Sequence, residues 1–300
     1  MYLLVFFIVL FGWQFIGVIP LAVTAILHSE STSEFLRAAD DSFMSLGINK
    51  NLFLFMMVAM FAFGLTSLFL GIKYIHKRAI KTVITSREKI DWSRFWFGFF
   101  IWGILSVIVV SSDILLSPEN YTWNFKPLPF FTLVAVSFLF LPIQTSFEEL
   151  LFRGYFMQGL GTWFKNKWVP LIVTSVAFGL LHGANPEVEK LGYISMVFYI
   201  GTGFFFGITT LMDEGTELAL GLHAINNIVA AFLVTTDWTV FQTDALFVDT
   251  SDPSVGIEMF LPVFVLYPLM LLLFSKKYGW RNWKEKLFGN IEKPEITKES

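Results

Sequence analysis

The chain of 300 residues is 55% hydrophobic and 18% aromatic, and only 15% of its residues are charged. Soluble globular proteins carry about 25% charged residues, so this composition excludes a chain whose surface faces water on every side. The net charge of −3 excludes a basic nucleic-acid surface, and the absence of Cys excludes disulfides, a thiol nucleophile and Cys-ligated zinc. We therefore expect an all-α fold, a polytopic bundle of transmembrane helices.

Eight segments are apolar enough to be spans, since a spanning helix needs about 20 mostly apolar residues. The first, Met1–Leu27, has no basic leader and exceeds the roughly 7–15 residues of a signal-peptide core, so we expect it to be a span. In chain order the others are Leu52–Ile75, Phe95–Leu116, Leu128–Phe147 (continuing towards Phe156), Val169–Leu181, Ile194–Met212, Leu218–Val234 and Ile257–Phe274. No repeat or long linker interrupts them, which predicts one bundle of about eight spans.

Lys and Arg concentrate at alternate ends of these segments. Sixteen of the 21 lie within residues 73–94, 165–167 and 276–298. The four at the opposite ends are Arg37, Lys50, Lys126 and Lys190. The acidic segments around Asp40–Asp41 and Asp244–Asp252 also fall at these lysine-poor ends. Because cytoplasmic loops hold Lys and Arg in excess, both termini are expected in the cytoplasm.

Three groups of polar residues interrupt the later apolar segments, where an ionisable side chain is costly and indicates function. They are Glu148-Glu149 with Arg153, Phe178 with His182, and His223 with Asn226 and Asn227. Residues four apart share a helix face, so Glu149 can pair with Arg153. Glu148 then faces elsewhere, as a candidate general base.

A carboxylate, two imidazoles and an amide suit two kinds of hydrolytic site. In the first, Glu148 and one histidine deprotonate a water molecule, while the second histidine and Asn227 stabilise an oxyanion. In the second, Glu148, His182 and His223 hold a divalent metal such as Zn²⁺. Asn is a poor zinc ligand and no His-Glu-x-x-His helix is present, but the residues alone leave both mechanisms open.

Purely structural roles are open for the same side chains. Glu149 and Arg153 can form a plain buried ion pair, because pairing is how a membrane interior tolerates charge. The histidines and Asn226 can hydrogen-bond neighbouring helices, and Phe178 can belong to the core. The spacing of Gly203 and Gly207 predicts close helix packing without any further role.

The motifs Glu148-Glu149-x-x-x-Arg153, Phe178-x-x-x-His182 and His223-x-x-x-Asn227 occur in this order on late helices. Together they resemble the CAAX protease and bacteriocin-processing (CPBP) family, also called the Abi or type II CAAX prenyl endopeptidase family. The resemblance covers Leu128 to Val234. It implies that Glu148 activates water with His182, and that His223 and Asn227 stabilise the oxyanion. It also implies supporting roles for Glu149, Arg153 and Phe178.

The family resemblance implies an active site buried in the membrane and a membrane protein or lipidated peptide as substrate. The cofactor is expected to be either none or a divalent metal. We expect three segments: transmembrane helices without a motif (1–127), catalytic core helices (128–236), and a last transmembrane helix with a basic cytoplasmic tail (237–300). The expected location is a bacterial plasma membrane, with the lipid bilayer as a partner and no nucleic acid.

Two functions outside proteolysis also fit buried polar groups. A secondary transporter would bury Glu, His and Asn along a pathway, but such proteins usually contain internal repeats, and the polar residues here lie only in the later half. A non-catalytic immunity or scaffold protein is the other alternative. The full set of Glu148, His182, His223 and Asn227 favours an enzyme over either.

Overall fold

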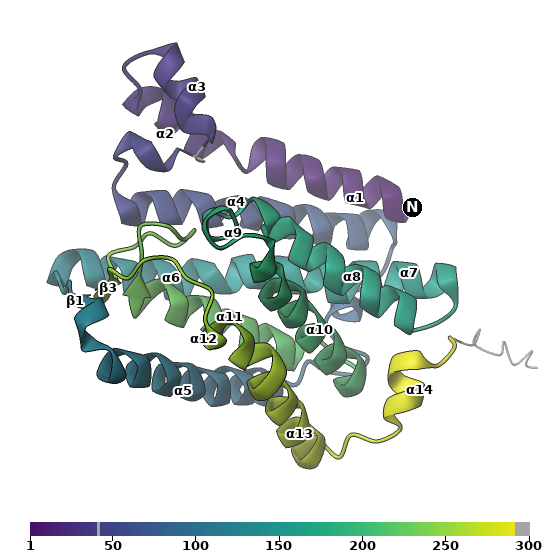
Figure 1. The fold of residues 1–300 in the computed structure, drawn as a ribbon. Coiled ribbons are helices and arrows are strands. Elements are labelled where there is room, and N and C mark those ends of the chain that lie inside the picture. The colour runs from purple at the N-terminus through teal and green to yellow at the C-terminus, as the bar shows by residue number, and fades with distance from the viewer. Residues whose placement is uncertain (41–42, 292–300) are drawn as a thin grey trace, which may run out of the picture. The chain divides into compact units, whose positions relative to one another are not determined.

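The computed structural model describes residues 1–40 and 43–291 (Figure 1). Asp41 of the predicted acidic segment, and Lys293 and Lys298 of the predicted basic tail, lie outside the described residues. The chain forms two compact units. Unit 1 comprises Met1–Thr82, Trp92–Glu148 and Leu220–Pro253, and unit 2 comprises Val83–Asp91, Glu149–Ala219 and the chain from Ser254 onwards.

Unit 1 contains the first three long helices, the first part of the fourth, and most of a later, shorter helix. In chain order its elements are α1 (Tyr2–Leu10), π-helical η1 (Phe11–Ile16), α2 (Ile19–His28), α3 (Thr32–Asp40), η2 (Met44–Leu46), α4 (Lys50–Leu70), η3 (Gly71–Ile75), α5 (Trp92–Leu116), η5 (Pro118–Asn120), β1 (Tyr121–Trp123), α6 (Pro127–Glu149), α11 (Glu217–Phe232), β2 (Val234–Thr235) and β3 (Phe247–Asp249). The last residue of α6 and the first three of α11 belong to unit 2.

Unit 2 holds the remaining helices. Segment η4 (Ile80–Val83) crosses the first boundary, and only its last residue belongs to unit 2. The others are η6 (Leu150–Phe156), α7 (Met157–Phe164), α8 (Trp168–Leu181), η7 (His182–Ala184), α9 (Pro186–Leu191), η8 (Tyr193–Ser195), α10 (Met196–Asp213), α12 (Ile257–Leu261), η9 (Pro262–Leu266), α13 (Tyr267–Tyr278) and α14 (Trp283–Phe288). Segment η6 is π-helical and continues α6 without a break, so Glu148 and Glu149 lie where an α-helix becomes a π-helix.

Among the described residues, six helices are long and apolar enough to cross a membrane. They are Tyr2–His28, Lys50–Ile75, Trp92–Leu116, Pro127–Phe164, Tyr193–Asp213 and Met259–Tyr278, and two shorter apolar helices are Trp168–Ala184 and Glu217–Phe232. All eight predicted segments are therefore helical, and the polytopic helical fold is confirmed. The fourth helix continues to Phe164, past its predicted end near Phe156.

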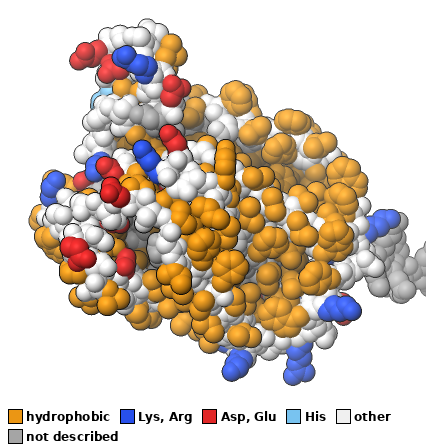
Figure 2. Space-filling view, viewed as in Figure 1, with side chains coloured by type: hydrophobic (Ala, Val, Ile, Leu, Met, Phe, Trp, Pro, Cys, Tyr) orange, Lys and Arg blue, Asp and Glu red, His pale blue; other side chains and the backbone are white. Residues whose placement is uncertain are grey.

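Large hydrophobic side chains are exposed on these helices, and orange side chains cover much of the face that Figure 2 shows. Phe7, Phe11 and Phe15 near the start of the chain are 60%, 56% and 62% exposed. In water such exposure would be unfavourable, because each buried apolar side chain contributes about 1.5–3 kcal/mol relative to exposure. Against lipid it is the expected arrangement, so these faces are consistent with an integral membrane protein.

Close backbone approaches set the helix packing in unit 1. Gly64 of α4 lies against the ring of Phe147 on α6, and a Cβ there would come within 2.6 Å of the ring. Gly221 of α11 lies against the carbonyl oxygen of Phe95 on α5, where any Cβ would overlap that oxygen. Small residues allow this approach between membrane helices. The approach places α11, which carries His223, directly beside α5.

Three short strands in unit 1 form a small sheet that the sequence did not predict. Strand β3 is central, antiparallel to β1 and parallel to β2. Nearby, Asn51 donates from Nδ2 to Asp244 Oδ2 at 3.2 Å and to the Pro129 carbonyl at 2.9 Å. These contacts link the start of α4 to the segment after α11.

In unit 2, α8 and α10 form the main helix pair. Gly203 of α10 faces the Ser175 carbonyl of α8 without room for a Cβ, and Gly207 faces Leu171 and Ser175. The close packing predicted from the Gly203 and Gly207 spacing is therefore confirmed.

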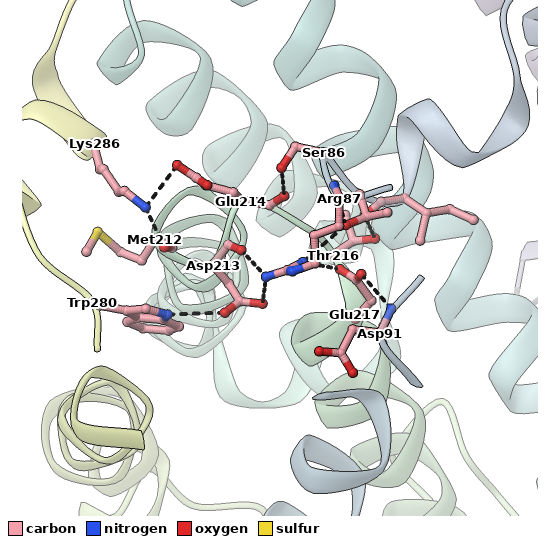
Figure 3. A network of polar contacts seen from close by, with 12 residues as sticks. Ser86, Arg87, Asp91, Met212, Asp213, Glu214, Thr216, Glu217, Trp280 and Lys286 are labelled. Carbon is pink, nitrogen blue, oxygen red and sulfur yellow. Dashed lines mark hydrogen bonds and ion pairs between the residues drawn. The ribbon is translucent and has the colours of Figure 1, made fainter. Parts of the chain in front are cut away.

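A buried polar network holds one end of α10 in unit 2 (Figure 3). Arg87 contacts Asp213 and Glu217, each at 3.1 Å, and these two carboxylate side chains are 0% and 1% exposed. Trp280 also donates from Nε1 to Asp213 at 3.1 Å, while Lys286 pairs with Glu214 at 3.0 Å. Buried carboxylates require such donors. The network therefore connects the loop before α5, the α10–α11 turn and the segment around α14.

Candidate active site

Glu148 lies on α6 in unit 1 with its carboxylate largely buried. Its Oε2 atom is 3.5 Å from His223 Nε2, and the two side chains are 12% and 5% exposed. Its Oε1 atom accepts a hydrogen bond from Gln144 Nε2 at 3.3 Å, from one helical turn earlier. No described residue donates a hydrogen bond to Oε2. A buried carboxylate oxygen without a donor can accept a proton or a hydrogen bond from a bound molecule.

His223 and Asn227 share one face of α11, as their spacing predicts. Asn227 Oδ1 accepts a hydrogen bond at 3.2 Å from Nδ2 of its neighbour Asn226. Asn226 Oδ1 in turn accepts one at 3.1 Å from the indole Nε1 of Trp102 on α5. Unit 1 therefore brings together Glu148, His223 and the side-chain amides of α11.

Glu149 and Arg153 form the predicted ion pair in unit 2. Arg153 Nη1 donates to Glu149 Oε1 at 3.1 Å, and both side chains are 0% exposed. Arg153 Nη2 also donates at 2.9 Å to the Gly203 carbonyl of α10. The pairing confirms the i,i+4 prediction and joins η6 to α10.

Three aromatic rings surround the Arg153 guanidinium. Its Cζ atom lies 4.3 Å from the centroid of the Phe178 ring, 5.6 Å from Phe206 and 5.9 Å from Phe152. A desolvated cation is attracted by the negative face of such rings. Phe178 is buried, so it belongs to the core. Its ring also contacts the ion pair directly.

His182 follows α8 in unit 2 and is held by contacts with Phe178 and Tyr199. Its Nδ1 atom lies 2.9 Å from the Phe178 carbonyl, and its ring stacks on Tyr199 with 4.5 Å between centroids. A carbonyl only accepts hydrogen bonds, so Nδ1 carries the proton. In the neutral ring Nε2 is then an acceptor, the form that a base requires. The Tyr199 hydroxyl donates to Glu187 Oε1, which also accepts from Asn185 at 3.0 Å.

The sequence-predicted residues divide between the units. Glu148, His223 and Asn227 lie in unit 1, whereas Glu149, Arg153, Phe178 and His182 lie in unit 2. The geometry within each unit brings Glu148 to His223 and Arg153 to Glu149 and Phe178. The approach of His182 to Glu148 stays a prediction.

The donor set gives limited support to a metal centre. Unit 1 supplies two candidate ligands, Glu148 and His223, whereas a catalytic zinc site normally has three protein ligands. Among the described residues, no group of three His, Asp or Glu side chains is arranged to hold a metal ion. The two ligands that unit 1 supplies do not by themselves make a three-ligand site, so no step of the mechanism below is assigned to a metal.

Four contacting residues were not predicted as part of the site: Gln144, Trp102, Tyr199 and Glu187. Gln144 had a usable signal, because it lies four residues before Glu148 on the same helix face. Asn226 was noted only as a structural residue, although it contacts Asn227. Trp102 and Tyr199 had no sequence signal, since tertiary packing alone brings them to Asn226 and His182.

Comparisons with known proteins agree with the motifs. A model of the type II CAAX prenyl endopeptidase Rce1-like family matches residues 127–229. The chain is 32% identical over 189 residues to the uncharacterized protein YyaK of Bacillus subtilis (strain 168), and the match covers 63% of each chain. The chain thus spans 63% of the length of that curated relative. No solved structure matches the chain.

The matched region contains every residue of the three motifs, from Glu148 to Asn227. The family resemblance deduced from the motif order is confirmed. Residues 127–229 of the chain are thus similar to the type II CAAX prenyl endopeptidase Rce1-like family.

Proposed function

We propose that this protein is an intramembrane endopeptidase that hydrolyses a peptide bond of a membrane-associated protein or lipidated peptide, as in CAAX processing. The family match over residues 127–229 and the apolar helices support this proposal. The observation that carries it is the Glu148 carboxylate. It is largely buried in an apolar helix, lies 3.5 Å from His223, and has an Oε2 atom that accepts no hydrogen bond from any described residue.

Glu148 is the proposed general base. It takes a proton from a water molecule as the water oxygen attacks the carbonyl carbon of the scissile bond. His182 assists as a second acceptor, because its Nδ1 proton is directed to the Phe178 carbonyl and Nε2 is unprotonated in the neutral ring. The proton then passes from Glu148 to the leaving amine as the C–N bond breaks. One water molecule is consumed and the carboxylate is regenerated.

The developing oxyanion is proposed to accept hydrogen bonds from His223 and Asn227. Donors positioned for this charge contribute most when water is excluded, and loss of one such donor typically costs about 100- to 1,000-fold in rate. Glu149, Arg153 and Phe178 are proposed to support the site, because their buried cluster fixes the helix segment that directly follows Glu148.

The catalytic core is proposed to span residues 128–236, with the Lys- and Arg-rich ends of the helices facing the cytoplasm. This orientation follows from the excess of Lys and Arg in cytoplasmic loops. A bacterial plasma membrane is the proposed location. The substrate is expected to reach Glu148 from within or beside the bilayer, because the surrounding helix faces are apolar.

The test compares proteoliposomes that contain wild-type protein, Glu148→Gln or Glu119→Gln, each incubated with the same membrane extract. Glu119 is exposed and lies in the same unit, so the same chemical change there controls for the substitution itself. Peptides released by the wild type and by Glu119→Gln, but not by Glu148→Gln, would support the proposal. Identical peptide profiles from all three folded proteins would contradict it and favour a binding or scaffold role.

A further inference from the structure

The side-chain amide of Asn227 can present either its oxygen or its NH₂ group to a substrate, and only the NH₂ group can stabilise an oxyanion. Which group is presented depends on the hydrogen bond that the other one makes. In this protein the Asn227 oxygen accepts a hydrogen bond from Asn226 Nδ2 at 3.2 Å. The NH₂ group is thereby left to donate.

The orientation of Asn226 is fixed by Trp102. The indole N–H of Trp102 lies 3.1 Å from Asn226 Oδ1, and an indole N–H can only donate. If the Asn226 amide were reversed, two N–H groups would face each other and one buried donor would lose its partner. The Trp102 donor therefore fixes the orientation of the Asn226 amide, and the Asn226 amide fixes the orientation of the Asn227 amide.

Helix packing holds Trp102 beside Asn226. Gly103, the next residue on α5, lies against Ile225, the residue before Asn226, and a Cβ on Gly103 would come within 2.7 Å of the Ile225 side chain. Further along the same helix pair, Gly221 lies against the Phe95 carbonyl. Trp102 itself is 6% exposed. The indole therefore has little freedom to leave the amide.

We infer that Trp102 and Asn226 are positioning residues that fix the Asn227 amide with its NH₂ group directed to the oxyanion. This inference rests on the proposed function, in which Asn227 is an oxyanion donor. Neither residue needs to contact substrate. Both act through the orientation of a side chain that does.

The test measures the initial rate at which proteoliposomes release the peptides whose release requires Glu148. The variants are Trp102→Phe, Asn226→Ala, Asn227→Ala and the double variant Trp102→Phe/Asn227→Ala. Trp96→Phe is the matched control, because Trp96 lies on the same helix and is 49% exposed. Each variant is first checked for a monodisperse profile in detergent. If Trp102→Phe does not fold, the pair Asn226→Ala and Asn226→Ala/Asn227→Ala replaces it.

Loss of one hydrogen bond should lower the rate of peptide release by Trp102→Phe about 3- to 10-fold. Asn226→Ala should lower this rate as well. On the Asn227→Ala background, Trp102→Phe should have no further effect, because no amide remains to be oriented. The Trp96→Phe control should release peptides at the wild-type rate.

Two results would overturn the inference while leaving the proposed function intact: an unchanged rate for Trp102→Phe, or an equal loss on both backgrounds, which indicates a structural role. If the wild type releases no peptide that Glu148→Gln does not, the proposed function fails and the inference fails with it.

Discussion

The adjacent carboxylates of Glu148 and Glu149 have different partners. Glu148 lies 3.5 Å from His223, whereas Glu149 forms a 3.1 Å ion pair with Arg153. Adjacent residues on a helix differ by about 100° in direction, so the two side chains cannot face the same neighbours. The pair therefore separates two roles, a proposed chemical one for Glu148 and a structural one for Glu149.

Replacing Glu149 by Gln is expected to destabilise the protein more than replacing Glu148 by Gln. The change leaves the Arg153 charge buried without a carboxylate, and breaking such a pair costs about 3–5 kcal/mol. Unfolding monitored by tryptophan fluorescence in detergent should show a lower midpoint for Glu149→Gln. Equal midpoints for the two variants would mean that the buried ion pair does not stabilise the fold.

The contact between Arg153 and Phe178 should appear as a coupling energy. A double-mutant cycle with Phe178→Leu and Arg153→Met is expected to give about 0.5–2 kcal/mol, the range for a partly or fully desolvated cation–π pair. The same unfolding assay measures all four proteins. Strict additivity of the two single changes would show that the 4.3 Å contact contributes nothing beyond packing.

Tyr199 is expected to affect peptide release through the His182 ring. An aromatic pair contributes about 0.5–1.5 kcal/mol beyond burial, so Tyr199→Leu should slow release roughly 2- to 12-fold by loosening His182. Tyr199→Phe retains the stacked ring and should release peptides at close to the wild-type rate. If Tyr199→Phe were as slow as Tyr199→Leu, the hydroxyl contact with Glu187 would be the important one.

The network around Asp213 offers a comparison between buried and exposed ion pairs. Arg87→Met removes the cation from two carboxylates that are 0% and 1% exposed, and is expected to cost about 3 kcal/mol. Lys286→Met removes the partner of Glu214, whose side chain is 63% exposed, and is expected to cost about 0–1 kcal/mol. Chemical unfolding of both variants measures the difference. A larger loss for Lys286→Met would reverse this ranking.

Much of the fold could be predicted from the sequence, because runs of apolar residues long enough to span a membrane have few alternative structures. The Glu149–Arg153 pair followed from helical spacing in the same way. The three short strands could not be predicted, since β1, β2 and β3 have three residues or fewer and cannot show a period. The fourth helix also extends to Phe164, past its predicted end near Phe156, because polar residues that usually end a span lie inside this helix.

The candidate site was predictable only where its residues follow one another on a helix. Glu148, His182, His223 and Asn227 stood out as polar groups in apolar segments. Their supporting contacts come from other helices: Trp102 from α5 to Asn226, and Tyr199 from α10 to His182. A single sequence gives no signal for such pairs, because tertiary packing creates them; the first depends on the small residues Gly103 and Gly221.

Solvent labelling tests the proposal that Glu148 activates water to cleave a peptide bond. Wild-type and Glu148→Gln proteoliposomes would be incubated with membrane extract in water labelled with oxygen-18, and released peptides analysed by mass spectrometry. If Glu148 activates the water, the wild type generates peptides carrying oxygen-18 in a newly formed carboxyl terminus, and Glu148→Gln generates none. Equal labelling by the folded Glu148→Gln protein would exclude Glu148 as the group that activates water.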